Sequence, residues 1–315
     1  MAIPVGTSVT LRVPASSANL GPGFDCVGLA LGVWDEATAT ITDGPGPLIE
    51  VTGSGADSVP LDESHLVYRT MVTAWGHLGE ELPKGVHLST RNAVPHGRGL
   101  GSSATAIVMG VAAAQALSSL GAGGTGELDL DVINSIACAL EGHPDNASAS
   151  VFGGATLSTT DAGDPLPTTR TVPLRLHEEI TPVVLVPHTQ LSTHTARSVL
   201  PEVVPLATAA ANSARVGLLV HALTSDPSLL TAGTTDLLHQ ESRRPSYAQS
   251  MALVDTLREG GVAATISGAG PSVLALTTAD QIETVSALAA AREAEWQVLT
   301  PGVPERGVHV VATSH

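Results

Sequence analysis

Apolar and polar residues alternate along several short stretches of this 315-residue chain, which is the pattern of strands that bury one face. Residues 7–13 are rich in β-branched side chains and predict a first strand. Residues 14–24 follow with two prolines and two glycines, so we expect the strand to end before them. The same alternation predicts strands at residues 31–42, 48–52, 86–91 and 155–160.

Helical spacing of apolar residues occurs between these strands and again in the second half of the chain. Because hairpins and helices are mixed in both halves, the pattern favours an α+β fold over a regular alternation of strand and helix. We expect helices at residues 64–78, 104–120, 129–140, 205–224, 227–239, 246–258 and 279–295, and further strands at 183–186, 262–267, 273–277, around Val298 and at 307–312.

A polar stretch with one glycine and two prolines, residues 161–171, interrupts the pattern near the middle of the chain. It predicts either a domain boundary or a long surface hairpin. The chain has the length of about two domains. We therefore divide it into an N-terminal domain at residues 1–163 and a C-terminal domain at residues 164–315.

Composition excludes several classes of function. The formal net charge is −16 and aromatic residues make up 2%, so a basic, base-stacking surface for nucleic acid is not expected. We find no apolar run of the roughly 18 residues that a membrane span needs, and the N-terminus lacks the regions of a secretory signal. Cys26 and Cys138 are the only cysteines, so no disulfide framework is expected and the cytoplasm is the predicted compartment.

One glycine-rich stretch precedes the apolar helix predicted at residues 104–120. Its alternate glycines allow tight turns and close approach of the backbone to a ligand, and Ser102 or Ser103 is a suitable N-cap. Free N–H groups and the dipole at a helix N-terminus attract anions, so the stretch predicts a phosphate site. The alternative is a turn that only caps a buried helix. The stretch reads Pro95-His96-Gly97-Arg98-Gly99-Leu100-Gly101-Ser102-Ser103-Ala104-Thr105.

Two common phosphate loops do not fit this stretch. A Walker A loop needs a lysine after its last glycine, and the only lysine of the chain, Lys84, lies before the stretch. The spacing from Gly99 to Ala104 matches G-x-G-x-x-A, but residues 92–98 separate it from the preceding strand. No acidic residue lies about 20 positions further on. The stretch is therefore a phosphate loop of another kind.

Residues 95–105 resemble the ATP loop of the GHMP small-molecule kinases, and three further motifs extend the resemblance in order along nearly the whole chain. These are residues 14–25 (PASSANLGPGFD), 141–146 (EGHPDN) and 267–272 (SGAGPS). Together they are most similar to the homoserine kinase branch of that family. The resemblance implies an N-terminal domain like domain 2 of ribosomal protein S5 and a ferredoxin-like C-terminal domain.

The chemistry of this family is phosphoryl transfer, which needs a phosphate cradle, Mg²⁺ and an aligned acceptor. By resemblance, residues 95–105 bind ATP, while Ser103 and Glu141 supply hard oxygen ligands to Mg²⁺. In some relatives the segment between this glutamate and the following H-x-D-N motif is longer, so this sequence departs from their pattern directly after Glu141. The predicted catalytic groups are these two residues and Asn146. The adenine pocket is expected near residues 65–67, where many relatives carry asparagine in place of His65.

The acceptor implied by the resemblance is L-homoserine, whose carboxylate suits an arginine fork and whose ammonium suits a carboxylate. Arg197 ends a T-x-x-A-R motif, and Arg243 follows a motif that departs from the family's H-x-P-Y-R, so Arg244 is an alternative. Asp25 and Asp145 are available to the ammonium, and a helix cap is the alternative role for Asp145 and Asn146. The remaining predicted substrate contacts are Asn19, His143 and Thr193.

The resemblance therefore implies an ATP-dependent kinase that phosphorylates the side-chain hydroxyl of L-homoserine in threonine biosynthesis. The alternatives are a mevalonate-type or sugar kinase of the same family and a catalytically silent relative that binds a small ligand. Lys84 lies outside every motif, which argues against relatives that activate the acceptor with a lysine. The expected partners are the two small-molecule substrates, without nucleic acid or membrane, and the family suggests a homodimer.

Overall fold

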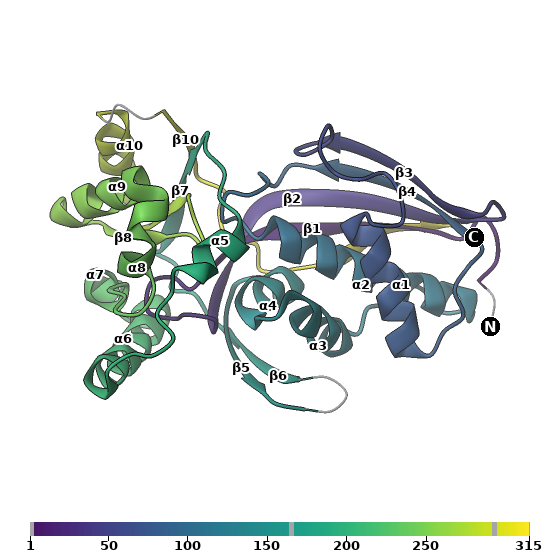
Figure 1. Cartoon of the computed structure of the whole chain (residues 1–315), viewed down its shortest axis with the longest axis horizontal. Helices are drawn as coiled ribbons and strands as arrows, with labels where there is room; N and C mark the ends of the chain where they lie inside the picture. The colour runs from purple at the N-terminus through teal and green to yellow at the C-terminus, as the bar shows by residue number, and fades with distance from the viewer. Residues whose placement is uncertain (1–2, 164–166, 292–294, 315) are drawn as a thin grey trace.

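The computed structural model describes residues 3–163, 167–291 and 295–314. In this part of the chain, the strands form one sheet of seven and one sheet of four. The two sheets, each with its own helices, lie next to one another along the long axis of the molecule (Figure 1). Strands and helices do not alternate regularly along the chain, so the α+β fold predicted from the pattern is confirmed.

The larger sheet has the strand order β11-β1-β2-β4-β3, and the β5–β6 hairpin joins it through β2. The only parallel pair among the described strands is β3 with β4. The long β2 pairs with β1 over most of its length, and with β4 and β5 near its two ends. The strands are β1 (Ser8–Ala18), β2 (Val27–Thr42), β3 (Gly46–Gly53), β4 (Gly85–Asn92), β5 (Ala155–Asp161), β6 (Thr168–Leu174) and β11 (His309–Ser314).

The first strand continues past Pro14, so the prediction that it ends at residue 13 is wrong. β11 pairs with β1 only as far as Arg12, which leaves that edge of β1 open at the proline. The Pro14 carbonyl accepts a hydrogen bond from Ser150 Oγ, and the missing N–H of proline breaks no ladder at an open edge. The extension brings the motif at residues 14–25 to the glycine-rich stretch, where Ser16 N donates to Leu100 O.

Helices α1–α4 lie together against one face of the larger sheet (Figure 1). α2 is the central one and contributes most of its apolar residues to the core. It is long and apolar enough to span a membrane, contrary to our expectation that no such run exists, but 72% of that run is buried inside the molecule. α4, which the apolar spacing does not predict, has Pro144 in its first turn. These helices are α1 (Leu66–Leu78), α2 (Ser102–Gly121), α3 (Leu130–Glu141) and α4 (Pro144–Phe152).

The smaller sheet is antiparallel, with the order β10-β7-β9-β8, and its core is formed with α9 and α10. The helix predicted at residues 279–295 ends earlier, at Ala290, and residues 292–294 lie outside the described part. The strands are β7 (Thr181–Pro187), β8 (Ala263–Ile266), β9 (Val273–Thr277) and β10 (Trp296–Leu299). The helices are α5 (Thr193–Ser198), α6 (Leu206–Thr224), α7 (Leu230–Gly233), α8 (Gln240–Arg243), α9 (Ala248–Glu259) and α10 (Ile282–Ala290).

The single helix predicted at residues 227–239 is wrong. A short 3₁₀ helix and α7 occupy its first half, and the chain leaves the helical path at Thr234. Asp236 accounts for the break, because its carboxylate accepts the backbone N–H groups of His239 and Gln240 and so starts a new helix, α8. This short helix carries Arg243 towards the region between the two sheets.

The sheets do not follow the predicted division at residues 163 and 164. Residues 168–174 form β6, which pairs with β5 in the larger sheet, and residues 309–314 form β11, which pairs with β1. Both segments thus belong with the first sheet, although the division assigns them to the second domain. The polar stretch at residues 161–171 lies in the β5–β6 hairpin, and residues 164–166 of it are outside the described part.

Candidate active site

The glycine-rich stretch forms a loop between β4 and α2, where it lines a narrow cavity of about 70 Å³. Gly101 has a φ of 69° and is itself the N-cap of α2, so the prediction that Ser102 or Ser103 caps this helix is wrong. Among the described residues, no side-chain cap hydrogen bond is made to the first turn. The helix therefore begins with free backbone donors beside the cavity, which is the arrangement that binds an anion.

Contacts with two other motifs hold this loop in place. Ser267 Oγ donates to Gly99 O at 2.6 Å, and Ser16 N donates to Leu100 O. A side chain at Gly99 would overlap with Ser267 O, and one at Gly101 would overlap with Ser16 Oγ. Both glycines are therefore required by neighbouring protein atoms as well as by their positive φ. The motifs at residues 14–25, 95–105 and 267–272 meet at this point.

Ser103 and Glu141 are brought together at the cavity by α2 and α3. Ser103 Oγ donates to Glu141 Oε2 at 3.0 Å, and both residues line the cavity. Burial raises the pKa of Glu141, while nearby His143 and the hydrogen bond from Ser103 oppose this effect. A hydroxyl and a half-buried carboxylate that line one cavity are hard oxygen ligands, so this pair fits the Mg²⁺ that the resemblance implies.

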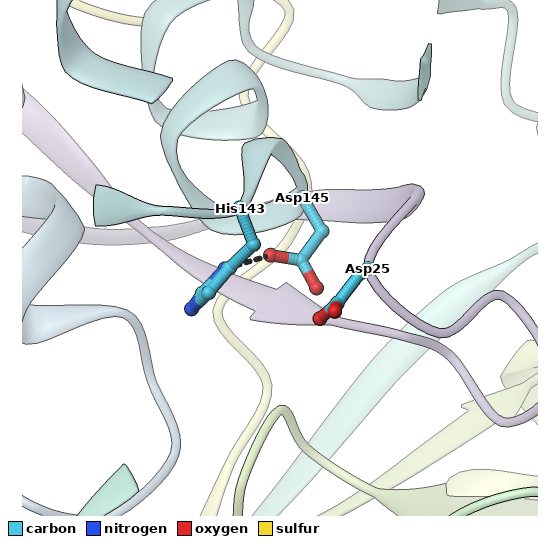
Figure 2. A group of neighbouring side chains, drawn as sticks. All are labelled: Asp25, His143 and Asp145. Carbon is cyan, nitrogen blue, oxygen red and sulfur yellow. Dashed lines mark hydrogen bonds and ion pairs between the residues drawn. The ribbon is translucent and has the colours of Figure 1, made fainter. Parts of the chain in front are cut away.

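Asp25, His143 and Asp145 form a second cluster, in which one ligand atom of each lies within 4.8 Å of the others (Figure 2). His143 Nδ1 lies 2.6 Å from Asp145 Oδ1. Burial alone lowers the pKa of His143, but the hydrogen bond to Asp145 and the nearby carboxylates outweigh it, so the pKa is raised. His143, and not Asp145, is the N-cap residue of α4. This cluster therefore places two carboxylates and a basic imidazole beside the cavity.

Arg197 on α5 and Asp25 form an ion pair with two hydrogen bonds, from Nη1 to Oδ2 at 3.1 Å and from Nη2 to Oδ1 at 2.5 Å. Asp25 has a φ of 55°, which is unusual for a residue other than glycine. Asn19 supports it, because Asn19 Oδ1 accepts from Asp25 N while its Nδ2 donates to Gly268 O. Arg197 and Asp25, both predicted substrate contacts, therefore bind each other. Asn19, another predicted contact, positions Asp25.

Arg243 is only 1% exposed and lines the same cavity as Arg197. Arg244, the alternative, is bound instead by Glu241 and Asp255 on the exposed side of α8 and α9. Position therefore favours Arg243 over Arg244 as the second arginine of the site.

Asn146 and Thr193 complete the predicted set, and both line the cavity. Ser16 Oγ donates to Asn146 Oδ1 at 3.0 Å, which leaves the amide N–H groups of Asn146 available as donors. Thr193 is the first residue of α5, the helix that carries Arg197. Ser16 was not predicted, because its contact with Asn146 joins positions 130 residues apart.

A larger cavity of about 280 Å³ adjoins the first one at Ser102 and Ser103. His65 and Thr90 line it, each is 4% exposed, and His65 Nδ1 and Thr90 Oγ1 have no hydrogen-bond partner in the described residues. Asp35 also lines this cavity, and burial raises its pKa to about 6. Buried polar atoms without partners are costly, so this cavity fits a polar ring such as a nucleotide base. Sequence reasoning placed the adenine pocket near His65 but missed Thr90 and Asp35, which lie in strands without a motif.

Profiles of two protein domains match the chain. That of the GHMP kinases N terminal domain matches residues 65–154, and that of the GHMP kinases C terminal domain matches residues 219–292. The homoserine kinase of Streptomyces coelicolor is 44% identical over 304 residues, which are 96% of this chain and 94% of the relative. The chain belongs to the GHMP kinase family. A second relative, the homoserine kinase of Cutibacterium acnes, is 48% identical to this GHMP kinase over 280 residues, with 89% and 92% of the two chains covered.

Solved structures agree with this assignment of the fold. The crystal structure of homoserine kinase from Cytophaga hutchinsonii superposes on this GHMP kinase with a TM-score of 0.82, at 26% identity and over 96% of this chain and 97% of that one. The mevalonate diphosphate decarboxylase of Staphylococcus aureus has a TM-score of 0.70 at 16% identity, over 97% and 98% of the two chains, and shares the fold. The two-domain fold implied by the four motifs is confirmed.

Proposed function

We propose that this protein transfers the γ-phosphoryl group of ATP to the side-chain hydroxyl of L-homoserine, giving O-phospho-L-homoserine for threonine biosynthesis in the cytoplasm. One observation carries the choice of acceptor. Beside the phosphate loop, the cavity is lined by two arginines, Arg197 and Arg243, and by the carboxylate of Asp145, while the carboxylate of Asp25, which does not line the cavity, pairs with Arg197 and lies close to Asp145. An amino acid with a terminal hydroxyl matches this combination of charges, whereas mevalonate and sugars lack the ammonium.

The Arg197–Asp25 ion pair suits a zwitterion. When its two members separate, the guanidinium can bind the substrate carboxylate and Asp25 can bind the ammonium, so every charge keeps an opposite partner. Arg243 would add a second fork to the carboxylate, and Asp145, held by His143, would add a second acceptor to the ammonium. A substrate that carries only one of these charges would leave one member of the pair unpartnered, which is costly.

Residues 95–105 and the first turn of α2 would hold the ATP phosphates, and the cavity around His65 and Thr90 would hold the base. Ser103 and Glu141 would hold Mg²⁺. Bound there, the ion neutralises negative charge on the phosphate oxygens during transfer. The hydrogen bond between Ser103 and Glu141 keeps both oxygens in place at the cavity wall.

No general base is required in this proposal. Asn146 has its Oδ1 bound to Ser16, so it can orient the acceptor hydroxyl or a phosphate oxygen with its N–H groups but cannot accept a proton. A loose transition state does not need early deprotonation, so the proton can pass directly to a γ-phosphate oxygen. Catalysis then rests on positioning and electrostatic stabilisation.

A coupled assay of ADP release over a panel of acceptors tests the proposal. The panel contains L-homoserine, L-serine, L-threonine, galactose and mevalonate. We expect L-homoserine to give the highest kcat/KM. A higher value for mevalonate or galactose would point to another kinase of the family, and no release with any acceptor despite tight ATP binding would point to a silent relative.

Replacing Arg197 by lysine is expected to weaken homoserine binding by about 1.5–3 kcal/mol, because the charge remains but the bidentate hydrogen bonding of the guanidinium to the carboxylate is lost. The measurement is the KM for homoserine at saturating ATP. Arg244→Lys is the matched control, since Arg244 pairs with Glu241 and Asp255 away from the cavity. An unchanged KM in Arg197→Lys would remove Arg197 from the substrate site.

Asp145→Asn and His143→Gln are expected mainly to raise the KM for homoserine and to lower kcat only modestly. The reason is that both residues serve the ammonium in this proposal and neither takes the acceptor proton. Steady-state kinetics with both substrates varied separates the two parameters. A fall in kcat of about 10⁴-fold with homoserine binding intact, near the upper range for a general base, would contradict the base-free route.

A further inference from the structure

Arg243 is a buried cation, and within the described residues its hydrogen bonds go only to uncharged acceptors. Its Nε donates to Ala196 O at 2.8 Å and its Nη1 donates to His239 Nδ1 at 3.1 Å. No carboxylate of the described residues forms an ion pair with it, although the side chain is only 1% exposed. Burial accordingly lowers its pKa. A buried cation without a counter-ion is costly, so its pocket is suited to an anion that arrives with the ligand.

The two contacts of His239 allow one protonation state. A guanidinium can only donate, so Nδ1 of His239 must be an unprotonated acceptor. The carbonyl of Gly21 can only accept, and it lies 2.9 Å from Nε2, so Nε2 must carry the hydrogen. The ring is therefore neutral, as expected for a side chain that is 1% exposed. Burial also lowers the pKa of His239, which favours the same neutral form.

Neighbouring groups hold this ring firmly. Asp236 anchors the backbone at His239 and also places Oδ1 3.6 Å from Nε2. The ring of Phe24 lies 5.1 Å from the imidazole, and the guanidinium carbons of Arg197 and Arg243 each lie 5.4 Å from the centre of the Phe24 ring. The Phe24 ring therefore lies near the imidazole and near both guanidinium groups. The next residue in the chain, Asp25, forms the ion pair with Arg197.

We propose that His239 is a positioning residue for substrate recognition: as a neutral imidazole protonated at Nε2, it orients Arg243 so that the remaining guanidinium N–H groups face the substrate carboxylate. The inference rests on the proposed function. His239 touches neither the cavity nor the reacting atoms, so it acts only through Arg243. The spacing of four residues places the two side chains on one face of a helical turn, which makes the contact short and local.

Two substitutions separate the two nitrogens of the ring. In His239→Asn the side-chain oxygen can replace Nδ1 as the acceptor for Arg243, whereas in His239→Gln the amide can replace only Nε2 and its contact with Gly21. We expect His239→Gln to raise the KM for homoserine about tenfold, which is the low end for a hydrogen bond to a charged group. We expect kcat and the KM for ATP to stay within about threefold, and His239→Asn to remain within about threefold of the unsubstituted protein in all three parameters.

The second measurement uses 3-aminopropan-1-ol, which is homoserine without its carboxylate, as a competitor against homoserine. Its inhibition constant should be the same for both variants and the unsubstituted protein, because it has no group for Arg243 to bind. Thermal unfolding of all three proteins shows whether each is folded. A His239→Gln variant that weakens homoserine and 3-aminopropan-1-ol by the same factor, or that behaves like His239→Asn, overturns the role of His239.

The same data distinguish failure of this inference from failure of the proposed function. If the unsubstituted protein binds 3-aminopropan-1-ol as tightly as homoserine, it does not recognise the carboxylate, and both the proposed function and the inference fail. If it prefers homoserine and the His239→Gln variant keeps that preference undiminished, only the inference fails.

Discussion

Replacing Glu141 by glutamine is expected to lower kcat by about 100- to 1,000-fold, the range for loss of one preorganised electrostatic contact to the transition state. Glutamine has nearly the same shape but no charge, so the fold and the hydrogen bond from Ser103 can persist while the negative ligand for Mg²⁺ is lost. Kinetics across a Mg²⁺ titration measure the effect. The half-saturating Mg²⁺ concentration should rise together with the fall in kcat.

Two further variants make this test specific. Ser103→Ala removes a neutral ligand from the same site, so a smaller effect of about tenfold is expected. Glu127→Gln removes one negative charge from an exposed position that does not line the cavity, and it should leave both parameters unchanged. If Glu141→Gln keeps normal turnover at limiting Mg²⁺, Glu141 is not a metal ligand in this protein.

Gly101→Val is expected to destabilise the fold by about 2–6 kcal/mol, the sum of backbone strain and overpacking, and to abolish detectable ATP binding. Its φ of 69° is unfavourable for valine, and the new Cβ would overlap with Ser16 Oγ and lie 3.0 Å from Asn146 Oδ1. The valine side chain thus clashes with atoms of the protein itself, even when no phosphate is bound. Urea unfolding and calorimetry with ATP measure the two effects.

Gly123→Val is the matched control for this substitution. Gly123 also has a positive φ, of 83°, but apart from its own chain neighbours no atom of the described residues lies within 4 Å of the Cβ that valine would add. It therefore reports the cost of backbone strain alone, at a site remote from the loop. If Gly101→Val were no less stable than Gly123→Val and still bound ATP, the close packing of Ser16 and Asn146 around the loop would not matter.

The sequence was sufficient to predict features that depend on short, ordered motifs. The loop before α2 and the position of Glu141 at the end of α3 both follow from such motifs, whereas the contacts of the loop with residues 14–25 and 267–272 were found only in the structure. The spacing of His239 and Arg243 also contained a usable signal, since residues four apart can meet on a helical turn. The prediction of one continuous helix over residues 227–239 hides this signal, because it places Arg243 beyond the end of that helix.

Other features could not be predicted, because they depend on partners far away in the chain. Ser103 Oγ donates to Glu141, 38 residues later, and does not cap the helix, whose N-cap is Gly101. The strand through Pro14 is possible only because β11, from the far end of the chain, stops pairing at Arg12. Local propensity holds no information about either partner.

The pairing of β11 with β1 also affects how the protein can be made. Figure 1 places the N- and C-terminal ends near the same end of the larger sheet, and the register joins Ser8 with Ser314. During synthesis, β1 leaves the ribosome before the second domain, whereas its outer neighbour β11 emerges only after that domain. Until then the β1 edge is unpaired and open to association with other chains. Completion of the first domain must therefore wait for β11, so the two domains cannot finish folding in the order in which they are synthesised.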